Sequence, residues 1–389
     1  RALYRLSVSA NCGLRGTIIM ERITPDMDYV RRILRELLAI PSPAGFTDEA
    51  VRFTCEELER LGISYEMTRR GAIRADLSGE IYSPDRSIVV HLDTLGAMVK
   101  ELKDNGRVTM SPIGTWSSRF AEGARATIYS DNGKFVGTIL PIKASGHTYD
   151  AEIDTLPVSW DTVEMRIDHP LYSRDDLVQL GINVGDFIAL DTETHMPETG
   201  FICSRYLDDK AGAAVLLAVA REIRNRKLTL PMDCHLLFTI SEEVGSGASG
   251  VLHGDVSEML TIDAGPSAPG QNTDEFGVTI CMKDSSGPFD YHLTHKLLDL
   301  CTEHGIRHKR DVFRYYRCDS ASAIEAGNDI RTALVCFGTD ATHGYERCHE
   351  NSLIALGELL GYYLQSDPTF KRDKKSLESS VEDFGELPV

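Results

Sequence analysis

The sequence predicts a doubly wound α/β domain with a mixed sheet, interrupted by an inserted β-rich domain. In residues 20–99 and 202–366, short apolar runs typical of buried strands alternate with helical periodicity. Between them, at 100–201, short β-type runs are punctuated by Gly, Asn, Asp and Pro, and helical periodicity is scarce. Acidic residues and histidines stand where strands end, which is where sites form in open α/β sheets.

The first domain segment opens with helical patterns. Thr24 is a candidate N-cap, and Pro25 suits the first helical position. Apolar residues then share one helical face: Val30, Ile33, Leu34, Leu37 and Leu38. A second helix is expected from Thr47 to a stop at Gly62. The apolar run SIVVHLD at 87–93 then predicts a buried strand.

The inserted segment is expected to be barrel-like. Its β-type runs read RVTM, ARATIYS, KFVGTILPIK, TVEMRID and GDFIAL, and the one helical pattern in it lies at 173–180. After it, 211–220 predicts a helix of small apolar residues that is buried on most sides. The runs CHLLFTI, EMLTID, GVTICM and TALVCF predict the remaining strands, with helices at 289–303 and 352–364.

The composition is typical of a cytoplasmic enzyme. The net charge of −18 over 389 residues makes nucleic acid and anionic membranes poor partners. The nine cysteines form no C-x-x-C pair, which is typical of reduced thiols, and no apolar run is long enough to span a bilayer. We expect residues 1–19 to be an extension, either from upstream translation or as an ordered arm, and 367–389 to be a polar tail.

One H-x-D motif and one acidic pair stand at element ends. His91 ends a strand, and the carboxylate of Asp93 can accept its second ring N–H and fix its tautomer. Asp208–Asp209 precede the buried helix, which places Asp208 deep in the protein. Taken alone, a histidine at a strand end is usually structural, and an acidic pair at a helix start is usually a cap.

Three further motifs add to this set. Glu242–Glu243 follow the strand at 234–240, and adjacent carboxylates of opposed direction can divide metal binding from proton transfer. Asp263 ends the next strand, and His349 precedes the last helix. His343 competes with His349, as a neighbour of the ligands or as a substrate-binding group. Together, the motifs predict a site for two divalent metal ions.

The order of these motifs resembles that of a known family. The stretches that carry the resemblance are HLDTLGAMV, GINVGDFIAL, SRYLDDKAGAAV, SEEVGSGASG, TIDAGPSAPG and RCHENSL, and it covers roughly Met20 to Leu364. They are similar to family 42 of the clan MH metallopeptidases, the deblocking or glutamyl aminopeptidases that build tetrahedral particles. Within that family, the resemblance is to the branch associated with the osmoprotectant N-acetylglutaminylglutamine amide.

The resemblance implies a dinuclear centre held by His91, Asp208, Glu243, Asp263 and His349. Asp208 would bridge the two ions, His91 and Asp263 would complete one, and Glu243 and His349 would complete the other. Zinc is the expected metal, with cobalt or manganese as alternatives. The Asp208–Asp209 peptide bond would be cis.

The resemblance also implies a function. Glu242 would be the general base and Asp93 would orient His91, in a cytoplasmic aminopeptidase that removes N-terminal residues from short peptides. The insertion would act as a lid and oligomerisation domain of a homo-oligomer, in the family's form a dodecameric tetrahedral particle. Departures at Lys210 and after His349 leave the substrate open, so the alternatives are a deacylase acting on an N-acyl or dipeptide-amide substrate and a non-catalytic metal-binding assembly subunit.

Overall fold

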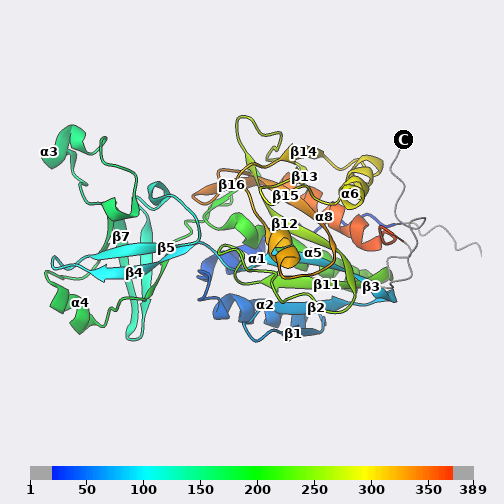
Figure 1. Ribbon diagram of the computed structural model, residues 1–389, viewed down its shortest axis with the longest axis horizontal. Coiled ribbons are helices and arrows are strands. Elements are labelled where there is room, and N and C mark those ends of the chain that lie inside the picture. Colours follow the sequence, from blue (N-terminus) through cyan, green and yellow to red (C-terminus); the bar gives the residue numbers. More distant parts are fainter. Residues whose placement is uncertain (1–19, 371–389) are drawn as a thin grey trace, which may run out of the picture.

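The computed structural model describes residues 20–370. The expected extension at 1–19, and the part of the expected tail at 371–389, lie outside these residues. The described chain forms a large mixed sheet with helices around it and a separate barrel that projects to one side (Figure 1). This is the predicted fold class.

The large sheet has ten strands. Along its main path they are β1 (Tyr65–Met67), β2 (Ile73–Leu77), β11 (Leu230–Thr239), β3 (Gly79–His91), β12 (Val256–Ser267), β15 (Arg331–Asp340), β13 (Val278–Lys283) and β14 (His308–Val312). Two short strands, β10 (Phe201–Ser204) and β16 (Glu346–His349), pair with each other, and β16 pairs with β15. The central strands β11, β3, β12 and β15 are mutually parallel, so their carboxyl ends lie at one edge.

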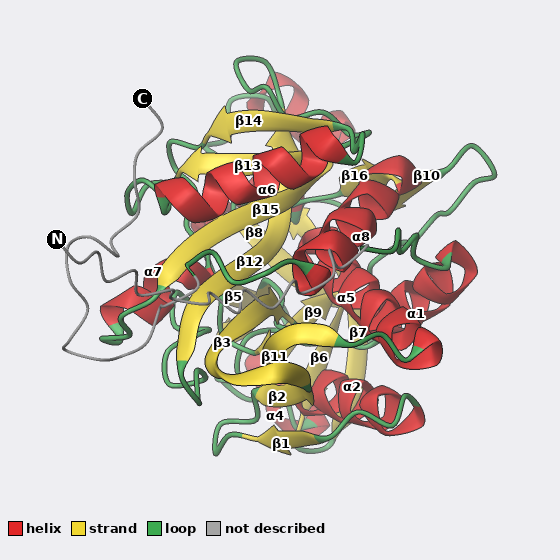
Figure 2. Ribbon diagram, turned by 90° about the vertical axis from the view of Figure 1, so that its right-hand side faces the viewer, coloured by secondary structure: helices red, strands yellow, loops and turns green. Residues whose placement is uncertain are grey.

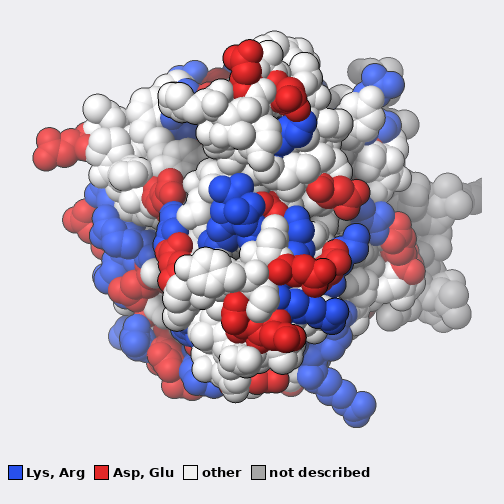
Figure 3. All heavy atoms as spheres, turned by 90° about the vertical axis from the view of Figure 1, so that its left-hand side faces the viewer, with Lys and Arg blue, Asp and Glu red and all other residues white. Residues whose placement is uncertain are grey.

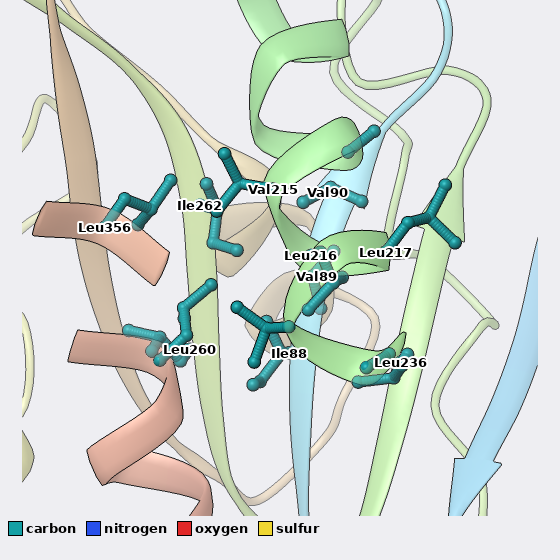
Figure 4. Close-up of a cluster of buried hydrophobic side chains, with 14 of the residues drawn as sticks. Ile88, Val89, Val90, Val215, Leu216, Leu217, Leu236, Leu260, Ile262 and Leu356 are labelled. Atoms are coloured by element: carbon teal, nitrogen blue, oxygen red, sulfur yellow. The ribbon is translucent and has the colours of Figure 1, made fainter. Parts of the chain in front are cut away.

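Helices cover this sheet. They are α1 (Met27–Ala39), α2 (Asp48–Arg60), α5 (Leu207–Arg226), α6 (Tyr291–Glu303), α7 (Asp319–Glu325) and α8 (Glu350–Gln365). Helix α5 packs against the strands β3 and β12 of the sheet and against its neighbouring helices α1 and α8 (Figure 2). Every residue from Leu207 to Ala220 is buried, as expected for small apolar side chains on all helical faces. Figure 4 shows Val215 and Leu216 of α5 packed with Ile88 of β3 and Ile262 of β12.

The start of α1 differs from the prediction. Its N-cap is Asp26, whose carboxylate accepts the backbone N–H groups of Asp28 and Tyr29. Thr24 is not the cap, because its hydroxyl donates to Glu358 of α8 at 2.9 Å. The predicted apolar face of α1 is buried as expected.

The inserted strands close into a six-stranded antiparallel barrel. In barrel order they are β4 (Gly96–Leu102), β5 (Val108–Ile113), β8 (Val163–Ile167), β7 (Gly133–Pro141), β6 (Arg125–Ser130) and β9 (Phe187–Leu190). The insertion also carries the helices α3 (Gly146–Tyr149) and α4 (Arg174–Leu180), and α4 starts with a capping box at Ser173. The barrel has its own apolar core, so it packs as a separate unit.

The described surface carries charges of both signs, and the described cysteines are unpaired. Figure 3 looks onto the barrel end and shows Lys and Arg side chains interspersed with Asp and Glu. Between residues 20 and 370, the cysteines are free thiols. None of the helices in that range combines the length and apolar character that crossing a membrane requires.

Candidate metal centre

The candidate site lies where the four parallel strands end. His91 is the last residue of β3, Glu242–Glu243 follow β11, and Asp263 lies in the carboxyl-terminal half of β12. His343 follows β15, and Asp208 is the second residue of α5. The sheet topology therefore brings together motifs that are far apart in the sequence.

The start of α5 is fixed against the end of α1 and against the sheet. Lys210 is fully buried, and its Nζ donates to the carbonyls of Leu37 (2.9 Å) and Ile40 (2.6 Å) at the end of α1. Burial lowers the pKa of Lys210 to about 7. A Cβ at Gly212 would lie 2.8 Å from Ile262 Cγ2 and 2.2 Å from Asp209 Oδ1, so the close approach of α5 to β12 requires glycine. The Asp208–Asp209 peptide bond is cis, as predicted.

Asp208 lies between two histidines. Its Oδ1 is 3.0 Å from His91 Nε2, and its Oδ2 is 3.7 Å from His343 Nε2. His343 Nε2 is also 3.6 Å from Glu243 Oε2. Each histidine directs its other ring nitrogen at a backbone carbonyl: His91 Nδ1 at Asp93 (2.8 Å) and His343 Nδ1 at Thr115 (2.8 Å). This second contact leaves Nε2 of both rings free to act as a ligand.

Asp93 acts differently from the prediction. The carbonyl of Asp93, not its carboxylate, is the hydrogen-bond partner of His91, since Oδ1 is 3.8 Å from Nδ1. The fully buried carboxylate instead accepts the backbone N–H groups of Glu242 (3.0 Å) and Glu243 (3.2 Å). Asp93 therefore holds the histidine and both glutamates through different atoms.

The remaining carboxylates complete two overlapping groups of possible ligands. One group is His91, Glu242 and Asp263, and the other is His91, Asp208 and Glu243; in each, the ligand atoms lie within 4.8 Å of one another. Glu242 Oε2 is 4.0 Å from His91 Nε2. Asp263 is buried and accepts the N–H of Ala264 at 2.6 Å.

The structure does not bring His349 into this group. His349 is the last residue of β16, where Glu346 and Cys348 point inward and His349 therefore points away. Its Nδ1 accepts the N–H of Asn351 as the N-cap of α8, and its Nε2 lies 3.2 Å from the carbonyl of Thr199. The placement expected for His349 is wrong, because the alternation of β16 and the start of α8 fix its ring elsewhere; His343 lies at the site instead.

The sequence reasoning missed two supporting carboxylates. The buried Glu346 accepts the N–H of Asp208 at 3.2 Å and the N–H of His343 at 3.0 Å, and so links α5 to the β15–β16 turn. The buried Asp319 accepts the hydroxyl of Thr239 at 2.6 Å and the N–H of Ala248 at 2.7 Å, and so fixes the loop that carries Glu242–Glu243. Nothing in their local sequence distinguishes either residue from an ordinary surface acid.

The site concentrates negative charge in a buried volume. Burial raises the pKa of Glu242, Glu243 and Asp263 well above their ordinary values, and for Asp263 the Asp208 charge adds to the rise. Burial also raises the pKa of Asp208, but hydrogen bonding and the charge of His91 outweigh it and lower that pKa. Hard carboxylate oxygens and free imidazole nitrogens are the donors that divalent zinc, cobalt and manganese take, so the residues fit such ions.

The site opens into a cavity of about 960 Å³. Its lining includes Asp208, Glu242, Glu243, Asp263 and His343 of the candidate site, together with Gln271, Arg314, Tyr315 and Arg317. Gly114 and Thr115, which follow the barrel strand β5, also line it. The cavity is large enough for several residues of a peptide, and the insertion contributes to its wall.

Comparisons with known proteins identify the family of this chain. Residues 71–359 match the family model described as M42 glutamyl aminopeptidase. The "Putative aminopeptidase YhfE" of Bacillus subtilis (strain 168) is 38% identical over 335 residues, which cover 86% of this chain and 96% of that protein. The "Glutamyl aminopeptidase" of Lactococcus lactis subsp. cremoris (strain MG1363) is 24% identical over 220 residues, covering 54% of this chain and 59% of that protein.

Solved structures share the fold. The TET aminopeptidase of a marine sediment archaeon of the Thaumarchaeota superposes with a TM-score of 0.79 at 18% identity, covering 86% of this chain and 96% of that one. The TET1 peptidase of Pyrococcus horikoshii, described as assembling into a tetrahedron or a large octahedral shell, gives 0.74 at 20% identity over 87% of this chain and 100% of that one. The chain therefore belongs to the M42 glutamyl aminopeptidase family of metallo-aminopeptidases.

Proposed function

We propose that this protein is a dinuclear metal-dependent aminopeptidase that removes N-terminal residues from short peptides. The observation that carries the proposal is the position of Asp208, whose two oxygens each face the Nε2 atom of a different histidine. Asp208 would bridge the two ions. His91 and Asp263 would hold one of them, and His343 and Glu243 the other. Zinc is the proposed metal, with cobalt or manganese as substitutes.

The chain's own residues supply the proton transfers. The metal ions, when bound, polarise the substrate carbonyl and acidify water. Glu242 accepts a proton from the attacking water as the new C–O bond forms, and it donates that proton to the leaving nitrogen as the C–N bond breaks. Asp93 supports this role because its carboxylate accepts the backbone N–H of Glu242 and so fixes the position of the Glu242 backbone.

The proposed substrate class rests on the family and on the space in the cavity. A peptide with a free α-amine is the proposed substrate because the matching family is one of aminopeptidases and the cavity has room for several residues of a peptide. A deacylase would instead accept a blocked nitrogen. Comparing one short peptide with its N-acetylated twin, under the same metal loading, tests the proposal. Faster cleavage of the acetylated peptide, of an N-acyl amino acid or of a dipeptide amide would replace it with the deacylase.

Metal removal tests the cofactor. Chelation is expected to abolish turnover of the free peptide, and zinc, cobalt or manganese should restore it, with two ions bound per chain at full activity. Full activity at one ion per chain would contradict the bridging role of Asp208. Unchanged activity after complete metal removal would contradict the whole proposal.

Assembly and location are part of the same proposal. The solved relatives include a dodecamer and a particle described as a tetrahedron or octahedral shell, which supports a homo-oligomer here, with the barrel as its assembly domain. A closed particle would admit short or unfolded chains to the cavity and exclude folded proteins. The free thiols of the described residues support a cytoplasmic location.

A further inference from the structure

A second group of histidines and carboxylates lies outside the candidate metal centre. It consists of Asp76 of β2, His235 of β11, His253 of the loop before β12, and Asp85 of β3. Asp76 and His235 face each other across the antiparallel pair β2–β11. His235 precedes the end of β11 by four residues, or about 13 Å of strand, so this group is separate from the site at the carboxyl edge.

Three of these side chains converge. His235 Nδ1 lies 2.7 Å from Asp76 Oδ1, and His253 Nε2 lies 3.5 Å from the same oxygen. The ligand atoms of the three residues all lie within 4.8 Å of one another. The two imidazole rings are adjacent, with centroids 4.0 Å apart. Two imidazoles and one carboxylate are a common ligand set for zinc.

Asp85 supplies an independent observation. Its side chain is only 5% exposed, and its Oδ2 lies 3.3 Å from His235 Nε2. Its Oδ1 has no hydrogen-bond partner among the described residues. A buried carboxylate on the far nitrogen of a histidine fixes the tautomer whose Nδ1 lone pair faces outward, as in carboxylate–histidine–zinc arrangements.

The backbone is shaped to bring His253 to this place. Gly254 has a φ of 69°, and a Cβ there would lie 2.5 Å from Asp85 Oδ2 and 3.1 Å from His235 Nε2. The loop can approach the two strands this closely because residue 254 is glycine. The exposed fractions of Asp76 (45%) and His253 (23%) leave the group open to solvent on one side.

We propose that Asp76, His235 and His253 form a second, non-catalytic site for a divalent transition metal, with zinc as the best fit. Asp85 is the positioning residue for His235. A metal here would join β2, β11 and the far end of the loop 240–255, whose first residues include Glu242–Glu243. The open side provides the fourth position for water, so binding is expected to be reversible.

Zinc content and affinity test the proposal on the full chain. After dialysis against zinc, His253→Ala and the size-conserving His253→Gln should each hold one zinc fewer per chain than the unsubstituted protein, with peptide turnover unchanged. His147→Ala, which removes an exposed histidine of the barrel insertion, is the matched control and should lose none. Asp85→Asn should keep the site but weaken its zinc affinity about 10–100-fold.

A different result would overturn it. If both His253 variants bind as much zinc as the unsubstituted chain, with the same affinity, then Asp76 and His235 form an ion pair and no metal site exists. Equal zinc loss in His147→Ala would show that surface histidines bind the ion without a formed site. Because the readout is the difference between variants, neither result depends on how many ions the catalytic centre holds.

Discussion

His343 and His349 occupy different environments, although the short strand β16 lies between them. His343 has a left-handed backbone (φ 58°) in the turn after β15, which directs its ring at Asp208 and Glu243. His349 caps α8, and its ring packs against the rings of Phe201 and Phe276. One histidine therefore belongs to the site and the other to the fold.

Alanine substitutions separate the two histidines. His343→Ala should lose one metal ion per chain and lower kcat by at least about 100-fold, since removing a ligand removes the charge that it positions. His349→Ala should keep both ions and lower the free energy of unfolding by about 1 kcal/mol, the usual cost of losing an N-cap. Metal analysis and urea unfolding of both variants decide this. Metal loss in His349→Ala alone would show that His349, and not His343, is the metal ligand.

Glu242 should be a base and not a ligand. Glu242→Gln keeps the size of the side chain but removes its ability to accept a proton, so kcat should fall by about 10²–10⁴. Its metal content should stay equal to that of the unsubstituted chain. Glu243→Gln is the matched control and should lose metal; a loss of metal in Glu242→Gln with full retention in Glu243→Gln would exchange the two roles.

At this scale, most residues of the candidate site could be predicted from the sequence. His91, Asp208, Glu242–Glu243 and Asp263 could be found because each follows a clear strand or precedes a clear helix. His343 could not be chosen over His349, because a single left-handed residue in a turn leaves no pattern in the sequence. The carbonyl of Asp93 could not be foreseen either, since every residue has one.

At the scale of elements, a buried ion pair joins the sheet to the end of α8. Arg86 of β3 and Glu258 of β12 are both buried, with Arg86 Nη2 and Glu258 Oε1 2.8 Å apart. Arg86 also donates to the carbonyl of Tyr363 in α8, and Thr369 donates its N–H to Glu258. Burial raises the pKa of Glu258, but Arg86 and its other partners outweigh this effect and lower it to about 2.

Removing the arginine should expose this dependence. Arg86→Met leaves the buried Glu258 with only the more distant Lys296, 3.8 Å away, as a counter-charge, so the free energy of unfolding at pH 7 should fall by about 3–5 kcal/mol in urea titrations. Lys143→Met removes one partner of the exposed pair Lys143–Glu152 and should cost less than about 1 kcal/mol. Equal losses of unfolding free energy in the two variants would show that the buried pair stabilises the fold no more than an exposed pair does.

The pH dependence of the same pair has a definite sign. The folded pKa of Glu258 lies below its ordinary value of 4.5, so its contribution to stability is complete above pH 4.5 and is lost as the pH falls toward about 2. In Arg86→Met the carboxyl can protonate at higher pH. The stability difference between the two proteins should therefore narrow below pH 4.5, and a difference that widens on acidification would contradict this account.

Elements with strong apolar patterns were predicted, and those without were missed. The strands around 87–93 and 234–240 and the helix at 211–220 have long buried runs that only a core position explains. The edge strands β1 and β14 were missed because exposed side chains dominate them. The barrel strand β4 (GAMVKEL) was missed because it follows the H-x-D motif directly, so its short apolar start reads as a loop.

At the scale of the whole molecule, the barrel extends away from the sheet domain (Figure 1). The topology of the insertion could be predicted only as barrel-like, because strand order depends on pairings between distant residues. Its surface keeps several large apolar side chains exposed: Phe120, Val136, Val158, Tyr172, Val178 and Val184. If another subunit covers the barrel, these exposed side chains would be buried in the interface.

Charged substitutions on the barrel should therefore prevent assembly. In light scattering, the unsubstituted chain should have the mass of a multimer. The double variant Val178→Glu/Val184→Glu should have a smaller mass, because burying two new charges in an interface is unfavourable. Val312→Glu is the matched control. It alters an equally exposed valine on β14 of the sheet domain, 53% exposed against 54% for Val178, and should not change the mass.

The dissociated variant should still cleave short peptides, since the proposed ligands come from one chain. It should also attack larger substrates that the assembled particle excludes. A monomeric mass for the unsubstituted chain, or a multimer that digests folded proteins as fast as short peptides, would refute the role of the barrel in assembly and in limiting access.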